Sequence, residues 1–328
     1  MEKFILFAVA AFSTYISTFF ARMFALKQAI IDTPNERSSH SVPTPRGGGI
    51  GIGIIWFIGL IFLRYCNEIE DSLFYAFLSG SILFVMGFLD DRFDLRPSIR
   101  LTAQFIASGV ALWFLGGVSK VDFGFAEIEA FWIWTPIALI GIIWFINLYN
   151  FIDGIDGYAS MEAIFISFCF FLLFHDSFLL ILAAATFGFI IWNWQPAKIF
   201  LGDSGSTLLG FNIIIFTIYY QKTCEISILA LLIPSVLFWF DASWTLIRRF
   251  RNKEKLTKAH KKHAYQRLVQ SGFSHQKTVI YAFFFNLIFA MLFFASWFYK
   301  TWVFLFFSLS VLIAYLSIKL IDKRKPFK

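Results

Sequence analysis

The sequence has few cysteines and few charged side chains for its length of 328 residues. Its three cysteines, Cys66, Cys169 and Cys224, show no paired spacing, so they support neither a disulfide framework nor a cysteine-based metal site. Charged residues make up only 15% of the chain. No internal repeat, low-complexity segment or stretch typical of a soluble domain is present. These absences argue against a soluble globular protein.

Apolar side chains take the place of the missing charges. They make up 59% of the residues, and aromatic rings alone make up 21%, whereas a soluble domain is about 45–50% apolar. The composition predicts an all-α polytopic membrane protein with a single integral membrane domain, 1–328. Because each span needs about 20 mostly apolar residues, we expect about 11 transmembrane helices, some of them short, tilted or broken. Their approximate ranges are 3–22, 48–63, 72–89, 100–116, 131–149, 160–174, 178–195, 206–220, 226–247, 278–298 and 302–318.

Basic residues are concentrated in alternate loops. With segment 147–160 in the cytosol, the cytosolic loops are about 22–47, 90–100, 150–162, 196–205 and 248–277, together with the tail 319–328. They hold 23 of the 28 Lys and Arg residues, the bias expected of cytosolic loops. The N-terminus is therefore predicted to be periplasmic and the C-terminus cytosolic, with the first span retained. The net charge of +7 then indicates attraction to anionic lipid headgroups and not to nucleic acid.

Segment 147–160, NLYNFIDGIDGYAS, is a dense polar cluster between two apolar runs. It contains Asn147, Asn150, Asp153 and Asp156, with a glycine directly after each aspartate. Either acid alone would serve as a helix cap. Two Asp-Gly pairs within five residues favour a backbone bent close to a ligand, with acids directed at a cation or at the ligand's donor groups.

Two further acidic clusters are expected at the same membrane boundary. One contains Asp90 and Asp91 within GFLDDRFD, and the other contains Asp203 within FLGDSGS. Neutralisation by neighbouring arginines would explain the first, and helix capping would explain the second. Charge at a membrane boundary tends to be functional, however, and carboxylates suit a Mg²⁺ ion that carries phosphates. We therefore predict that Asp90, Asp91 and Asp203 are catalytic and hold the metal on the cytosolic face.

The sequence does not decide the role of two further features. The glycine-rich run 47–53 suits either a phosphate at a helix N-terminus or close packing of helices by small residues. Asp241 lies within a predicted span, where an ionisable side chain is expected to be buried and paired.

The basic loop 248–277 carries His260 and His263, spaced to bind zinc. Lys261 and Lys262 beside them would oppose a dication. We therefore expect the loop to face an anionic or sugar-bearing substrate.

These motifs, in this order and over nearly the whole chain, resemble the polyprenyl-phosphate N-acetylhexosamine-1-phosphate transferases. The resemblance rests on GFLDDRFD (87–94), NLYNFIDGIDG (147–157), FLGDSGS (200–206) and HKKHAYQR (260–267). It implies that Asp90 orients or deprotonates a lipid phosphate and that polar residues across the motifs bind the UDP-sugar. These substrate-binding residues are Asn147, Asn150, Asp153, Asp156, Asn193, His260, His263 and Arg267.

The resemblance also implies the reaction and its participants. A UDP-N-acetyl amino sugar and undecaprenyl phosphate are the expected substrates, UMP is a product, and Mg²⁺ is the cofactor, with Mn²⁺ as a substitute. The muramyl branch of the family typically has Lys where Asp94 stands and a tighter histidine triplet at 260–263. Both departures favour the branch that starts O-antigen or other surface polysaccharides at the bacterial inner membrane. A homodimer is expected by analogy.

Two other functions remain as alternatives from the sequence. A membrane prenyltransferase would also carry DDxxD, but its second motif is ordinarily another aspartate-rich repeat. A secondary transporter usually has broken helices at the bilayer midplane, whereas most acids here are expected at one face.

Overall fold

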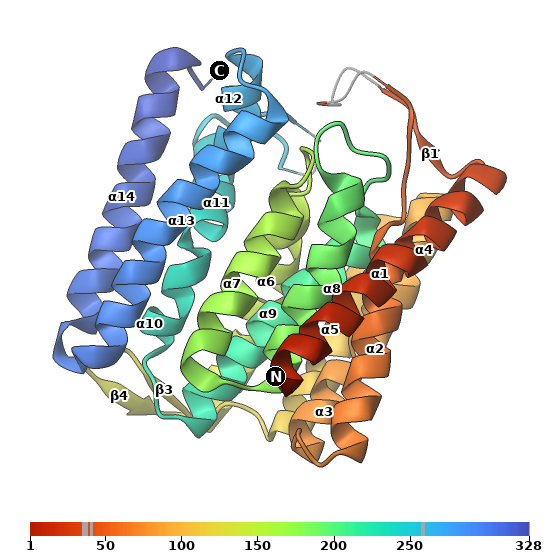
Figure 1. Ribbon diagram of the computed structural model, residues 1–328. Coiled ribbons are helices and arrows are strands. Elements are labelled where there is room, and N and C mark those ends of the chain that lie inside the picture. The colour runs from red at the N-terminus through yellow and green to blue at the C-terminus, as the bar shows by residue number, and fades with distance from the viewer. Residues whose placement is uncertain (35–38, 40–41, 257–259, 328) are drawn as a thin grey trace.

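Helices make up most of the computed structural model, which describes residues 1–34, 39, 42–256 and 260–327 (Figure 1). The α-helices are α1 (Glu2–Lys27), α2 (Gly49–Tyr65), α3 (Asp71–Leu78), α4 (Ser81–Phe93), α5 (Pro97–Leu115), α6 (Phe131–Phe151), α7 (Tyr158–Phe174), α8 (Ser177–Asn193), α9 (Gly202–Thr223), α10 (Ile228–Leu232), α11 (Val236–Arg251), α12 (Ala264–Gln270), α13 (His275–Phe298) and α14 (Val303–Arg324). Short 3₁₀ turns cover Ile233–Ser235 and Lys300–Trp302. Two antiparallel ladders pair β1 (Ile31–Asp32) with β2 (Thr44–Pro45) and β3 (Lys120–Asp122) with β4 (Glu127–Glu129).

The lengths of the helices confirm the predicted class. Seven helical segments of the described chain are long and apolar enough to cross a membrane, and α2, α7 and α8 are shorter apolar helices. The seven segments are Glu2–Lys27, Asp71–Phe93, Pro97–Leu115, Phe131–Phe151, Ile228–Arg251, His275–Phe298 and Lys300–Arg324. The count of about 11 spans and their orientation stay predictions.

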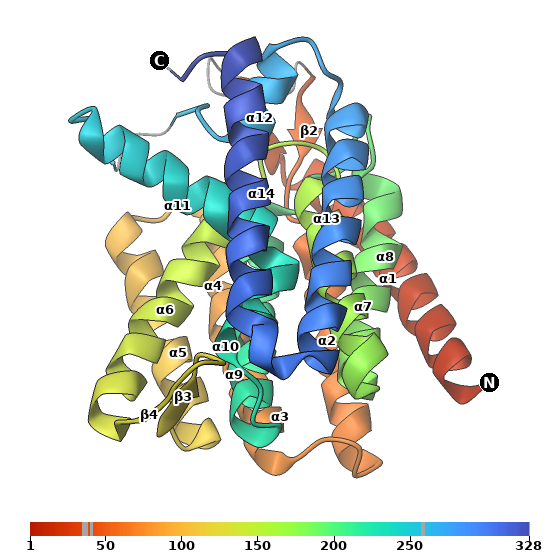
Figure 2. The same cartoon turned by 90° about the vertical axis from the view of Figure 1, so that its left-hand side faces the viewer.

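Helix α9 lies at the centre of the bundle. Nearly all of its residues are buried, and it packs against α2, α4 and α6 (Figures 1 and 2). By contrast, α1, α13 and α14 expose many large apolar side chains. An apolar outer surface suits contact with lipid, which solvates such side chains as well as a protein core does.

The glycine-rich run packs the start of α2 against the start of α9. The amides of Gly48 and Gly49 donate to the carbonyls of Phe200 and Leu201, both at 2.8 Å. A Cβ atom added to Gly49 would lie 2.2 Å from the amide nitrogen of Gly205. Of the two roles left open by the sequence, the structure supports close helix packing.

The three acidic clusters come together at one end of the bundle. Figure 1 shows α12 and the C-terminus at this end, and the N-terminus and the β3–β4 ladder at the other. The end of α4 and the end of α6 are each joined there to the start of α9 by side-chain hydrogen bonds.

Candidate active site

A polar cavity of about 280 Å³ opens where four connecting segments meet. Its walls come from the α1–α2, α6–α7 and α8–α9 connections and from the region of α12 and the start of α13. The polar residues that line it are Asp32, Ser39, Arg46, Asn150, Asp153, Asp156, Asn193, Asp203, Gln266 and His275.

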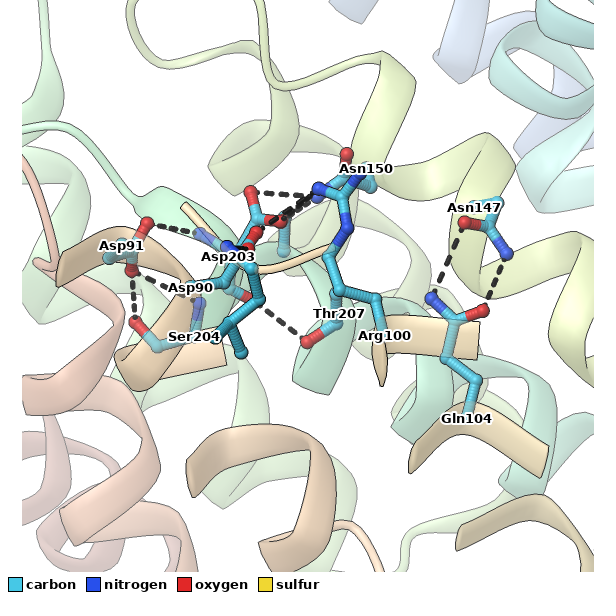
Figure 3. A network of polar contacts seen from close by, with 11 residues as sticks. Asp90, Asp91, Arg100, Gln104, Asn147, Asn150, Asp203, Ser204 and Thr207 are labelled. Carbon is cyan, nitrogen blue, oxygen red and sulfur yellow. Dashed lines mark hydrogen bonds and ion pairs between the residues drawn. The ribbon is translucent and has the colours of Figure 1, made fainter. Parts of the chain in front are cut away.

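Asp203 stands at the start of α9, on the cavity wall. Its carboxylate accepts a hydrogen bond from Asn150 Nδ2 at 3.2 Å and contacts Arg100 Nη1 at 3.4 Å (Figure 3). Asn150 also donates to Ser206 Oγ at 2.8 Å, one turn further along α9. The end of α6 and the start of α9 are thus tied together through Asn150.

Asp90 reaches the same cluster from the end of α4. It is buried, accepts the Leu95 amide at 2.7 Å and pairs with Arg100 at 3.1 Å. The amide can point back because Asp94 ends the helix with a left-handed backbone, φ 50°, a conformation that aspartate tolerates better than most residues. Arg100 therefore holds two carboxylates from helices distant in the sequence (Figure 3).

Asp91 has a different structural role from Asp90. Its carboxylate accepts hydrogen bonds from the Asp203 amide at 2.9 Å and from the Ser204 amide and hydroxyl at 3.3 and 3.1 Å. These amides begin α9, and a carboxylate placed there satisfies groups without intrahelical partners. A Cβ atom on Gly202 would lie 2.5 Å from Asp91 Oδ2, and φ is +75° there, so glycine is required. Asp91 thus caps the helix in place of Asp203, the cap considered from the sequence.

The α6–α7 connection brings Asp153 and Asp156 to the cavity. Asp156 accepts the Ala197 amide at 3.2 Å, and its other oxygen lies 3.3 Å from Nδ1 of His275. Although Asp153 faces the cavity, its burial raises the pKa of its carboxyl well above the ordinary value, and the negative charge of Asp203 adds to this effect. A cation or a hydrogen-bond donor of a ligand in the cavity would favour the charged form of Asp153.

Asn193 lines the cavity and also joins two of its walls. Its Oδ1 accepts the Gly157 amide at 3.0 Å and the Ser160 hydroxyl at 3.3 Å, while Nδ2 donates to the Ile199 carbonyl at 3.1 Å. These bonds hold the α6–α7 connection against the α8–α9 connection.

Four residues predicted to bind substrate lie outside the cavity lining. Asn147 exchanges hydrogen bonds with Gln104, at 2.7 and 3.3 Å. Arg267 forms an ion pair with Asp322 of α14 and donates to the Lys325 carbonyl at 3.0 Å. The other two are His260 and His263.

His260 and His263 of the basic loop are both disfavoured in the charged form. Their ring centroids are 4.8 Å apart. Burial lowers the pKa of His260 to about 4 and that of His263 to about 3. Both rings can therefore act as neutral hydrogen-bonding groups, and the positive charge of the loop comes from its lysines and arginines.

Asp241 anchors the helix that follows the basic loop. Both of its carboxylate oxygens lie 2.9 Å from the Ala264 amide, at the start of α12. The next residue, Tyr265, donates its hydroxyl to the Phe151 carbonyl at 2.7 Å, at the end of α6. Asp241 thus positions α12, which in turn braces the α6–α7 connection and presents Gln266 to the cavity.

Sequence reasoning missed five polar residues of the cavity wall: Asp32, Ser39, Arg46, Gln266 and His275. Arg46 and Asp32 form an ion pair at 2.7 Å across the β1–β2 ladder. The pairing of β1 with β2 brings Arg46 close to Asp32. Strands of two residues are too short to be predicted from a sequence, so this pairing could not be expected. Nothing local to His275 or Gln266 marks either residue as part of a site.

Taken together, the fold and the site define a multi-pass membrane enzyme with acids from separate helices gathered at one end of the bundle. The family described as Glycosyl transferase family 4 matches residues 73–221. A probable undecaprenyl-phosphate N-acetylglucosaminyl 1-phosphate transferase of Bacillus subtilis is 29% identical over 87% of this chain and 82% of its own. An undecaprenyl-phosphate alpha-N-acetylglucosaminyl 1-phosphate transferase of Thermotoga maritima is 29% identical (86% and 87%), and one of Escherichia coli K12 is 27% identical (81% and 76%).

Residues 73–221 thus match the model of glycosyl transferase family 4, and the chain is similar over most of its length to polyprenyl-phosphate sugar-1-phosphate transferases. The resemblance inferred from the motifs is thereby confirmed, and the protein is a phosphotransferase.

Proposed function

We propose that this protein transfers an N-acetylhexosamine-1-phosphate from a UDP-sugar to undecaprenyl phosphate and releases UMP. The observation that carries the proposal is the convergence of Asp90 and Asp203 on Arg100 beside a polar cavity. A lipid phosphate and a water-soluble nucleotide can meet only at the membrane surface. The names of the relatives, which include decaprenyl-phosphate N-acetylglucosaminephosphotransferases, support the same chemistry.

In the proposed reaction, an oxygen of the lipid phosphate bonds to the sugar-bearing phosphorus, and the bond from that phosphorus to the oxygen of UMP breaks. Such transfers depend mainly on positioning and charge neutralisation. Asp90 orients the lipid phosphate, while Asn150 fixes the carboxylate of Asp203 toward the cavity. Asp153 and Asp156 of the α6–α7 connection, which also line the cavity, bind the uridine nucleotide.

The donor set fits a magnesium ion. Among the described residues no group of three His, Cys, Asp or Glu side chains forms a metal site. Mg²⁺ does not require one, because it is usually bound through one or two carboxylates and substrate phosphates. Asp90 and Asp203 would hold it, whereas the oxygens of Asp91 already bind the start of α9. When bound, the ion would neutralise charge on the diphosphate.

We further propose that the product initiates O-antigen or another surface polysaccharide at the bacterial inner membrane. Asp94 stands where the muramyl branch typically has lysine, and the relatives of Bacillus subtilis and Escherichia coli named above are N-acetylglucosaminyl 1-phosphate transferases by name. The muramyl-pentapeptide branch is the alternative.

The test is to incubate purified protein with undecaprenyl phosphate, Mg²⁺ and a panel of UDP-N-acetyl sugars. We expect one or more sugars to yield UMP and a lipid-linked product in equal amounts. Uptake of labelled sugar into vesicles without a lipid-linked product would instead indicate a transporter. Consumption of a prenyl diphosphate would indicate a prenyltransferase.

A further inference from the structure

The charge on the cavity wall is unbalanced. Four aspartates line the cavity, at positions 32, 153, 156 and 203, but among the described residues only Arg46 contributes a lysine or arginine side chain. We propose that Arg46 binds the diphosphate of the nucleotide-sugar. This inference rests on the proposed function and adds to it a binding residue outside the motifs that define the family resemblance.

The backbone fixes Arg46 next to the acidic cluster. Its amide donates to the Ile30 carbonyl at 3.1 Å, and the carbonyl of the preceding Pro45 accepts the Phe200 amide at 2.8 Å. Phe200 lies three residues before Asp203. Since Arg46 and Asp203 also line the same cavity, a ligand phosphate beside Asp203 lies near the Arg46 side chain.

The guanidinium group retains capacity for an anion. Its contact with Asp32 runs from Nη2 at 2.7 Å, and the side chain is 39% exposed. A guanidinium carries five donors in a planar fork that matches phosphate oxygens. Asp32 can thus hold one edge of the group and leave donors for the ligand.

The other nearby cations have different partners. Arg100 lies between Asp90 and Asp203, and balances those carboxylates. Arg267, which the resemblance places among the residues that bind the UDP-sugar, is 3% exposed and paired with Asp322. Arg46 is consequently the cation best placed to neutralise a diphosphate that enters the cavity.

The experiment measures binding of UDP and of uridine to the purified protein, together with steady-state kinetics. For Arg46→Gln we expect the Kd for UDP and the KM for the UDP-sugar to rise about 10- to 100-fold, the loss typical of a charged hydrogen bond. The Kd for uridine and the KM for the lipid phosphate should stay unchanged. Arg46→Lys, which keeps the charge and loses the fork, should recover part of the affinity.

Asp32→Asn separates phosphate binding from a merely structural ion pair. It breaks the same pair but removes negative charge, so we expect UDP to bind a few-fold more tightly. Equal weakening in Arg46→Gln and Asp32→Asn would overturn the proposal, as would unchanged UDP affinity in Arg46→Gln. Arg64→Gln, which breaks an ion pair with Asp71 outside the cavity, is the control variant.

The outcomes distinguish this inference from the proposed function. If the wild type makes lipid-linked sugar and Arg46→Gln retains its UDP affinity, only the role of Arg46 is wrong. If UDP binds in an Arg46-dependent manner but no lipid-linked product forms, the transfer reaction is wrong and the binding role stands. Absence of UDP binding to the wild type would overturn both.

Discussion

Both ends of the helix bundle contain Arg–Asp ion pairs, but the two pairs differ in burial. Away from the cavity, Arg64 pairs with Asp71 at 2.5 Å, and their side chains are 38% and 61% exposed. At the cavity end, the Asp90 side chain is 7% exposed and is bonded to a backbone amide as well as to Arg100. Exposed pairs contribute about 0–1 kcal/mol, whereas buried carboxylates are costly unless they are paired. The buried carboxylate of Asp90 is therefore stabilised by two partners, which the exposed pair does not need.

Close packing of glycines accompanies this difference. At the cavity end, Gly49 and Gly87 allow α2 and α4 to approach the backbone of α9. A Cβ atom on Gly109, in the middle of α5, would meet nothing within 4 Å. Gly87 thus lets α4, which carries Asp90 and Asp91, lie directly against the start of α9, which carries Asp203.

Metal removal should produce the largest effect, and only at the cavity end. Treatment with EDTA is expected to reduce sugar-phosphate transfer to background, and excess Mg²⁺ should restore it, because Asp90 and Asp203 cannot neutralise a diphosphate. Asp71→Asn should show the same metal dependence as the wild type. Full activity in EDTA would contradict the proposed metal role.

Gly49→Ala should destabilise the fold by about 3 kcal/mol or more, because the added methyl group meets backbone atoms of α9. The same change at Gly109 should be neutral or stabilising by up to about 1 kcal/mol. Thermal unfolding in detergent compares the two variants. Equal midpoints of thermal unfolding for the two variants would show that the close packing at the cavity end does not contribute to the stability of the fold.

His263 should make stability depend on pH. Its folded-state pKa of about 3 lies below the unfolded value of about 6.5, so the unfolded chain binds the proton first. The stabilisation is fully present above pH 6.5 and is lost as pH falls, by about 2 kcal/mol at pH 5. His263→Asn should flatten this slope, whereas His175→Asn, at an exposed position away from the cavity, should not. Unfolding midpoints of the three proteins from pH 7.5 to 5 measure this dependence. If the slope in His263→Asn equals that of the wild type, burial of a neutral His263 ring is not the cause of the pH dependence.

Tyr265→Phe should have the smallest effect, a loss of about 1 kcal/mol for one hydrogen bond. Because its hydroxyl braces the α6–α7 connection, we expect the KM for the UDP-sugar to rise a few-fold with little change in kcat. Tyr299→Phe, at an exposed position outside the cavity, is the control. A fall in kcat alone would argue against bracing as the role of Tyr265.

Local sequence information was sufficient to predict the class of fold and to identify several of the acidic residues near the site. Long apolar runs predict spans without knowledge of their partners, and Asp203, Asp153 and Asp156 stand at the ends of such runs. The structure brings these three residues to one cavity. Polar residues at helix boundaries were therefore recognisable individually.

Pairings between distant segments could not be predicted in the same way. Asp91 caps a helix more than a hundred residues away, and Arg267 pairs with Asp322 of the last helix. Asp241, whose role the sequence left open, holds the start of α12. Each pairing depends on which helices pack together, and one sequence carries no direct record of that.

The most direct test of the central claim follows the phosphorus atom. A UDP-sugar labelled with ³²P in the sugar-bearing phosphate is incubated with undecaprenyl phosphate and either the wild type, Asp203→Asn or Asp71→Asn. We expect the label in the lipid fraction for the wild type and Asp71→Asn, with unlabelled UMP released, and no transfer by a folded Asp203→Asn variant. Label retained on the nucleotide as UDP, or normal transfer by Asp203→Asn, would contradict the account.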